Sequence, residues 1–120
     1  MLDIRLQRIF NRIVKDFDLD YGNAGAEYFD REGRFIGYIE APNNTTLTID
    51  INFDVSKEMT DREIKDKFLS SIKEAIKDFD PEKVFEEVWH RGFEFSAFEF
   101  VDMLREDEEF FKTRLYGFLN

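Results

Sequence analysis

One stretch of the chain alternates apolar and polar side chains without interruption, and this alternation constrains the fold more than any other feature. Neighbouring side chains of a β-strand point to opposite faces of a sheet. The apolar positions are Leu47, Ile49, Ile51 and Phe53, and the polar positions are Thr48, Asp50, Asn52 and Asp54. A strict period of two therefore predicts a strand with one face buried and the other in water.

Two further strands precede this one. The segments 26–30 and 34–40 flank a short charged turn that ends in Gly33, where a glycine suits a hairpin with a left-handed residue or a bulge. Residues 41–44, which include a proline and two asparagines, supply the next turn. The order of strands and turns predicts a three-stranded antiparallel meander.

Helical spacing appears on both sides of the predicted sheet. Between Leu2 and Phe17, apolar residues recur at steps of three and four, with arginine and lysine on the remaining faces, which is typical of an amphipathic helix. Thr60 and Glu63 have the spacing of a capping box and predict the start of a second helix. Its expected buried stripe is Ile64, Phe68, Ile72, Ile76 and Phe79.

The remainder of the chain also has helical signals. Asp80 and Pro81 favour the start of a short helix that ends at Gly92, and Ser96 with Glu99 forms a second capping box. A helical pattern then resumes at Phe111, Leu115, Phe118 and Leu119. We expect an α+β fold: an N-terminal helix, a three-stranded antiparallel sheet (meander), then three to four C-terminal helices. A length of 120 residues fits a single domain spanning 1–120.

The composition indicates a protein of the cytoplasm. Without cysteine there is no disulfide framework, so a reducing compartment is the natural location. Charged residues interrupt the start of the chain, and no later stretch reaches the ~18 uncharged apolar residues of a membrane span. We therefore expect a cytoplasmic protein that does not bind membranes.

Candidate catalytic and metal-binding patterns are weak. The one histidine, His90, cannot build a two-histidine zinc site, and we expect a capping or surface role for it. Asp16, Asp18 and Asp20, with a later glutamate, have the spacing of a calcium loop, but Tyr21 occupies the position that requires glycine. No phosphate-binding or nucleophile motif occurs. We expect a protein that is not an enzyme and holds no metal or cofactor.

Charge is the most informative bulk property. The chain has 27 acidic and 17 basic residues, a formal net charge of −10. From Asp78 to Glu109 there are 12 acidic and 3 basic residues, a net of −9. Neutralising phosphates requires lysine and arginine, so direct binding to nucleic acid is not expected. Such a field instead favours a protein partner with a basic groove.

Aromatic residues are interleaved with these acids, and two interpretations stay open. The helices wrap a phenylalanine-rich core with solvated acidic faces, or the acids and aromatics form an anionic docking surface. Adjacent Phe110 and Phe111 are not expected to point the same way, nor are Phe95, Phe98 and Phe100. The candidate partner-binding residues of a docking surface are Glu86, Glu87, Glu94, Asp102, Glu106, Asp107, Glu108, Glu109, Phe95 and Phe98.

The element order and the acidic tail Glu106-Asp107-Glu108-Glu109-Phe110-Phe111 resemble small acidic phage-encoded anti-CRISPR proteins, which inhibit type II CRISPR effector nucleases. The resemblance is one of architecture and implies DNA mimicry, in which carboxylates stand in for phosphate oxygens and block the DNA-binding cleft. It also implies that the protein acts in the host cytosol, if it is phage-encoded. The alternative is a phage or mobile-element interaction or regulatory protein that binds a partner, or itself as a homodimer, through an aromatic surface.

Overall fold

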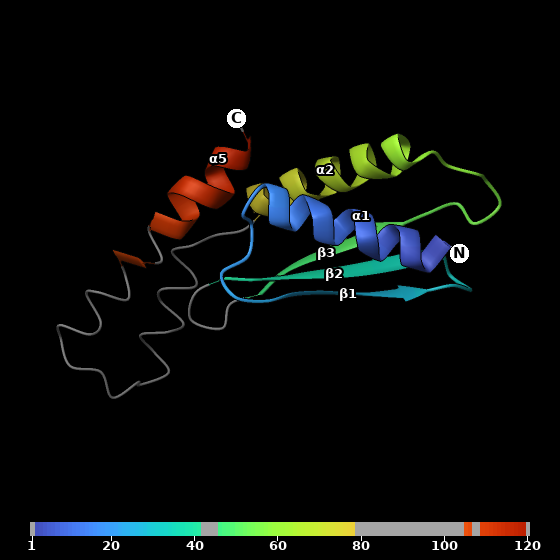
Figure 1. The fold of residues 1–120 in the computed structure, drawn as a ribbon, viewed down its shortest axis with the longest axis horizontal. Coiled ribbons are helices and arrows are strands. Elements are labelled where there is room, and N and C mark those ends of the chain that lie inside the picture. The colour runs from blue at the N-terminus through green and yellow to red at the C-terminus, as the bar shows by residue number, and fades with distance from the viewer. Residues whose placement is uncertain (1, 42–45, 79–104, 107–108, 120) are drawn as a thin grey trace.

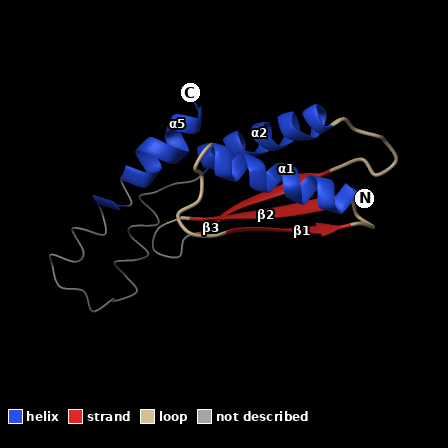
Figure 2. Ribbon diagram, viewed as in Figure 1, coloured by secondary structure: helices blue, strands red, loops and turns tan. Residues whose placement is uncertain are grey.

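The computed structural model describes residues 2–41, 46–78, 105–106 and 109–119. Two helices, α1 and α2, lie side by side on one face of a three-stranded antiparallel sheet, and the helix α5 lies beside their ends (Figures 1 and 2). The elements are α1 (Leu2–Asp16), β1 (Ala24–Phe29), β2 (Arg34–Glu40), β3 (Thr46–Asn52), α2 (Asp61–Asp78), the π-helix η2 (Phe110–Leu115) and α5 (Tyr116–Leu119). The α+β class and the order of helix, sheet and helices are confirmed.

The sheet has the strand order β1-β2-β3, as expected for a meander. Ala26 pairs with Gly37, and Gly37 with Ile49, which puts these three positions on the face that the helices cover. The strict alternation in β3 is confirmed, because its apolar side chains are buried and its polar ones are exposed. β1 begins at Ala24, two residues before the predicted start, because its pairing with β2 extends to Ala24 and Ile39.

Gly33 closes the hairpin between β1 and β2 in the left-handed conformation, with φ of 62°. A Cβ atom at this position would collide with the carbonyl oxygen of Phe53, so both the backbone conformation and the space require glycine. The Phe53 N–H donates a hydrogen bond to the Gly33 carbonyl at 2.6 Å, which ties the hairpin to the end of β3. The prediction of a left-handed residue in this turn is confirmed.

The centre of the core is a cluster of phenylalanine rings from different elements. Phe10 of α1, Phe35 of β2 and Phe68 of α2 contact one another, with ring centroids 4.9 to 5.7 Å apart and tilted or edge-on geometry. Phe53, which follows β3, adds a fourth ring 5.6 Å from Phe68. The quadrupoles of aromatic rings favour such arrangements over face-to-face stacking. Four of the 15 phenylalanines of the chain thus form the centre of the core.

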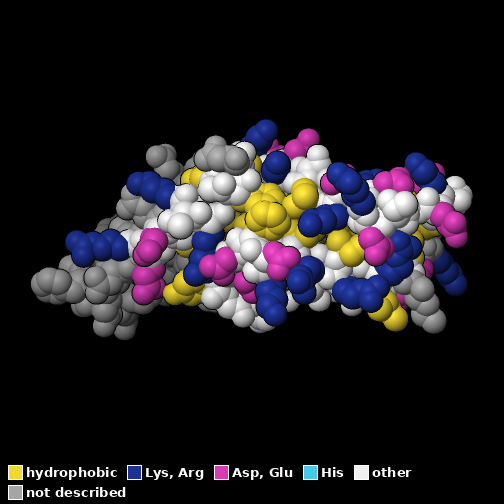
Figure 3. All heavy atoms as spheres, turned by 45° about the horizontal axis from the view of Figure 1, so that its top comes forward, with side chains coloured by type: hydrophobic (Ala, Val, Ile, Leu, Met, Phe, Trp, Pro, Cys, Tyr) yellow, Lys and Arg dark blue, Asp and Glu magenta, His cyan; other side chains and the backbone are white. Residues whose placement is uncertain are grey.

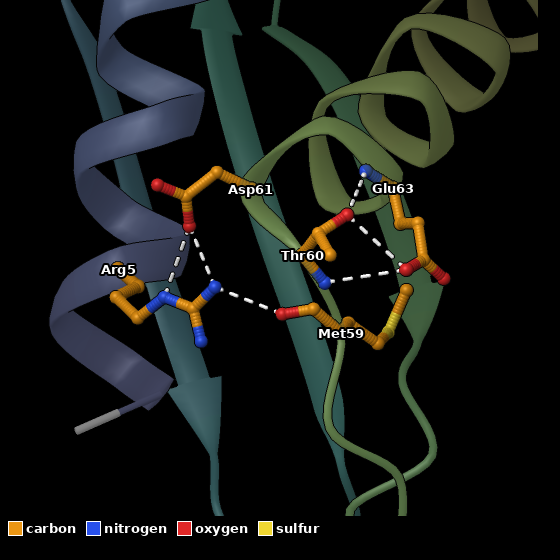
Figure 4. Close-up of polar contacts among 5 residues, drawn as sticks. All are labelled: Arg5, Met59, Thr60, Asp61 and Glu63. Carbon is orange, nitrogen blue, oxygen red and sulfur yellow. Dashed lines mark hydrogen bonds and ion pairs between the residues drawn. The ribbon is translucent and has the colours of Figure 1, made fainter.

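Polar contacts fix the start of α2 beside the start of α1 (Figure 4). Arg5 donates hydrogen bonds to Asp61 Oδ1, at 2.6 Å from Nη2, and to the Met59 carbonyl at 2.9 Å. The Thr60 hydroxyl accepts a hydrogen bond from the Glu63 N–H at 3.2 Å, and Glu63 Oε1 accepts one from the Thr60 N–H at 3.4 Å. The predicted capping box is confirmed, and the two helices run in the same direction (Figure 1).

Helices follow the sheet, as expected, but their number is not established by the described residues. The predicted short helix that ends at Gly92 and the capping box at Ser96 lie outside those residues, as do His90 and Phe79. Phe111 and Leu115, where the pattern resumes, are buried. In the part of the chain that the structure describes, no helix is both long enough and apolar enough to cross a membrane.

The close approach of Phe10 to β2 makes Gly37 a sensitive position. A Cβ atom on Gly37 would lie 2.7 Å from Cζ of Phe10, so the buried ring must shift when that atom is added. We expect Gly37→Ala to lower the free energy of unfolding by about 1–3 kcal/mol in urea denaturation. Gly25→Ala in β1 is the matched control, since nothing lies within 4 Å of its added Cβ. Equal stability of the two variants would contradict the packing of Phe10 on Gly37.

On the solvent face of the sheet, Asp50 accepts hydrogen bonds from Arg34, with 2.6 Å between Oδ2 and Nη2. These bonds hold the pKa of Asp50 below that of an ordinary aspartate, and the charge of Arg34 acts in the same direction. A lowered pKa stabilises the fold above the pKa of the unfolded chain, and this contribution is lost as pH falls through the folded pKa.

We expect Arg34→Gln to raise the pKa of Asp50 in an NMR titration of the carboxyl carbons. Asp54 provides the internal control, because its pKa is lowered by hydrogen bonds from Ser56 rather than from Arg34. An Asp50 midpoint that does not change in the variant would show that the ion pair is not formed in solution.

Candidate functional site

The C-terminal segment, residues 105–106 and 109–119, packs against the loop 17–23 between α1 and β1. Tyr21 Oη donates a hydrogen bond to Glu106 Oε2 at 3.1 Å, and the ring of Tyr21 meets that of Phe110 edge-on at 6.0 Å between centroids. Arg114 donates to the Asp20 carbonyl at 3.0 Å and pairs with Asp18 Oδ2 at 3.2 Å. Residues nearly 100 positions apart in sequence thus form one surface.

The loop takes this shape because of how α1 ends. Asp18 has φ of 52°, its N–H bonds the Lys15 carbonyl at 3.3 Å, and the Leu19 N–H bonds the Val14 carbonyl at 3.0 Å. This is the hydrogen-bond pattern of a Schellman motif, in which a left-handed residue ends the helix and the next residue makes an apolar contact. Leu19 is fully buried, so the motif turns the Asp18 carboxylate outward to meet Arg114.

The aspartates of this loop do not gather into a metal site. Asp16 pairs with Arg12 at 3.1 Å, and Asp18 pairs with Arg114. Among the described residues, no group of three or more histidines, aspartates or glutamates is placed to hold a metal ion. The calcium-loop spacing in the sequence therefore corresponds to the end of α1 and the loop that follows it, where Asp16 and Asp18 pair with arginines.

Only two of the predicted partner-binding residues lie in the described part of the chain. Glu106 and Glu109 are both exposed, and Glu106 is held against the α1–β1 loop by Tyr21. Their neighbourhood adds the exposed carboxylate of Asp18, which belongs to the same surface through Arg114. The others lie outside the described residues: Glu86, Glu87, Glu94, Phe95, Phe98, Asp102, Asp107 and Glu108.

Both phenylalanines of the acidic tail, Phe110 and Phe111, are buried in the core. Phe110 is 4% exposed and Phe111 is 2% exposed, and their rings contact each other at 5.7 Å. They lie at the start of the π-helix η2, whose wide turn differs from the α-helical spacing assumed for the sequence. Phe110 is also covered by Tyr21 and by the guanidinium of Arg114, 5.4 Å from its ring centroid.

This burial assigns separate roles to the acids and aromatics of the tail motif 106–111. The two phenylalanines anchor the C-terminal segment to the core, whereas Glu106 and Glu109 face the solvent. The roles of Tyr21 and Arg114, which hold the segment in place, were not predicted from the sequence. Both roles depend on contacts between distant parts of the chain. Tyr21, an aromatic residue in a loop that also contains two aspartates, was the signal in the sequence that could have indicated this contact.

Comparisons with known proteins give no further guide to this site. No protein-family model, no curated protein and no solved structure matches the chain.

Truncation of an anchor ring separates a core role from a binding role. We expect Phe110→Ala to lower the free energy of unfolding by about 3–5 kcal/mol, because it opens a cavity beside Phe111 and Tyr21. Glu109→Ala, at the adjacent exposed position, should change it by less than about 0.5 kcal/mol. Urea denaturation measures both. A Phe110→Ala variant as stable as Glu109→Ala would show that the ring is not part of the core.

Proposed function

We propose that the protein is an acidic inhibitor that binds the basic groove of a nucleic-acid-binding protein. In its most concrete form it is an anti-CRISPR protein that blocks DNA binding by a type II guided nuclease through DNA mimicry. The observation that carries the proposal is the separation within the tail motif, where the carboxylates of Glu106 and Glu109 are exposed and the phenylalanines that follow are buried.

The anchoring of this motif supports mimicry. A carboxylate replaces a phosphate effectively when it is already held in place, because ordering a flexible side chain on binding costs free energy. Glu106 is held by Tyr21, and the segment that follows is fixed by buried rings and by Arg114. The acidic surface therefore starts at a segment that is already held in place before a partner binds.

The chemistry of the expected partner follows from the acids. Guided nucleases hold DNA in a positively charged channel and read a short DNA motif with arginines. Arginine pairs with a carboxylate through two parallel hydrogen bonds, as it does with phosphate. The 12 acidic and 3 basic residues between Asp78 and Glu109 supply the charge density that such a channel attracts.

An interaction protein that binds through an aromatic surface is the second candidate. The solvent face of the sheet supports it, because Phe29 and Tyr38 are exposed large hydrophobic side chains there. Ile36 lies between them on the same face and is half-buried. This patch differs from the predicted aromatics Phe95 and Phe98, which lie outside the described residues.

Salt dependence tests the inhibitor proposal. The tagged protein is used to capture partners from bacterial lysate at ~0.1 M and ~1 M salt, where the screening length falls from about 10 Å to about 3 Å. We expect a nucleic-acid-binding protein to be captured only at the lower salt, and its DNA binding to be inhibited by the purified chain. A partner held equally at both salts would instead favour the aromatic surface.

Charge reversal locates the binding surface. The triple variant Asp107→Lys, Glu108→Lys and Glu109→Lys should abolish capture of that partner and inhibition of its DNA binding, because like charges then face the basic groove. We expect its thermal unfolding to stay close to that of the unmodified protein.

The matched control for this variant makes the same change in charge at Asp30, Glu32 and Glu58, which are exposed in the β1–β2 turn and in the loop before α2. We expect the control to capture the partner as the unmodified protein does. If the tail variant inhibits fully, or if both variants fail alike, the acidic tail is not the binding surface.

A further inference from the structure

The pair of parallel helices carries a groove on its solvent side. The groove lies between α1 and α2 and has a volume of ≈ 1110 Å³. Its apolar lining includes Ile9 and Leu69, which are half-buried, and Phe17 and Ile4, which are 46% and 58% exposed. Figure 3 shows hydrophobic side chains at the surface of this side of the molecule, with lysines and arginines close to them.

The charge of the groove is opposite to that of the chain. Its lining contains five basic residues and three aspartates, on a protein whose net charge is −10. Two of the aspartates are already paired: Asp16 with Arg12, and Asp61 with Arg5, which lies outside the lining. Within the described ranges, the remaining four cations form no ion pair. They are Arg8, Lys15, Arg62 and Lys65.

These cations lie on both sides of the apolar strip. Arg8 and Lys15 are seven residues apart on α1, which is about two helical turns or ~10 Å along one face. Arg62 and Lys65 are three residues apart on α2 and share a face of its first turns. An apolar strip between two rows of cations is complementary to a helix with an apolar stripe and acidic flanks.

The dimensions of the groove fit a helix. The lining on α1 runs from Ile4 to Phe17, about 20 Å, and the lining on α2 from Asp61 to Leu69, about 12 Å. The groove therefore accommodates about two to three turns of a third helix packed against both α1 and α2. Recognition of an amphipathic helix in an apolar groove is a recurring mode of peptide binding.

We propose that the groove between α1 and α2 binds an acidic amphipathic helix of a partner protein. The apolar stripe of that helix lies on Ile9, Phe17 and Leu69, and its carboxylates pair with the cations on either side. The proposal does not rest on the inhibitor function, because it concerns a different surface with the opposite charge.

The observations favour a helix over the other anionic partners. Nucleic acid offers phosphates but no apolar stripe for the exposed Ile4 and Phe17, and the overall charge of −10 opposes its approach. The same net negative charge repels an anionic membrane, which would face a large part of the protein surface. A helix instead contacts only the groove, and at ~0.15 M salt the acids of the tail are screened beyond about 8 Å.

The test uses the full-length protein and a fluorescein-labelled synthetic helix of about 18 residues, with leucine at a helical spacing and glutamate on both flanks. A second peptide replaces each glutamate by lysine. Fluorescence anisotropy should show saturable binding of the glutamate peptide at micromolar concentration, and binding of the lysine peptide weaker by about tenfold or more.

Matched protein variants locate the site. Arg8→Glu with Lys65→Glu should weaken binding of the glutamate peptide by about tenfold or more, which is about 1.4 kcal/mol. Arg31→Glu with Lys77→Glu makes the same change in charge at exposed positions outside the groove and should leave the affinity within about twofold. Circular dichroism confirms that both variants are folded.

Several results would overturn the proposal. One is the absence of saturable binding of the glutamate peptide up to ~1 mM, including the case in which an acidic segment of the chain itself already fills the groove. Another is an equal loss of affinity in both variants. A third is that the glutamate peptide does not bind, whereas a short DNA duplex or phosphatidylserine vesicles do. Their binding would then be lost in the Arg8→Glu, Lys65→Glu variant.

Discussion

The contact of Phe68 with three other rings holds the described fold together. Phe10, Phe35 and Phe53 come from α1, from β2 and from the end of β3, and each has its ring centroid within 6 Å of that of Phe68. Because a protein core is closely packed, the fit of these rings sets how close α1 can lie to the sheet. Gly37 is a consequence of that closeness, since only a residue without a side chain leaves room for Phe10.

The local elements of this fold could be predicted from the sequence because their signals are local. Alternation in β3, the capping box at Thr60 and the glycine of the first hairpin each depend on residues a few positions apart, and each is confirmed. The start of β1 was placed two residues late, because Ala24 and Gly25 carry no strand signal and pair only through the register of β2.

The candidate site was harder to predict, for a physical reason. The sequence gives the sign and position of the charges, but not which aromatic residues of the acidic tail are buried. Both Phe110 and Phe111 lie in a π-helical turn, and Tyr21 from a distant loop meets the ring of Phe110, and neither feature has a signature within the tail. The basic residues of α1 were visible as a helical face, yet their position beside those of α2 depends on the parallel packing of the two helices.

The contacts of the C-terminal segment with the α1–β1 loop also bear on the order of folding. Tyr21 and Glu106 are 85 residues apart, and Arg114 and Asp20 are 94 apart, whereas the sheet and its two helices are complete by residue 78. During synthesis, the loop therefore emerges long before the side chains that cover it, and the ring cluster can assemble first. Closure of the loop is then a late event, and until it occurs Phe17 lacks the ring of Phe118 that meets it edge-on in the finished protein.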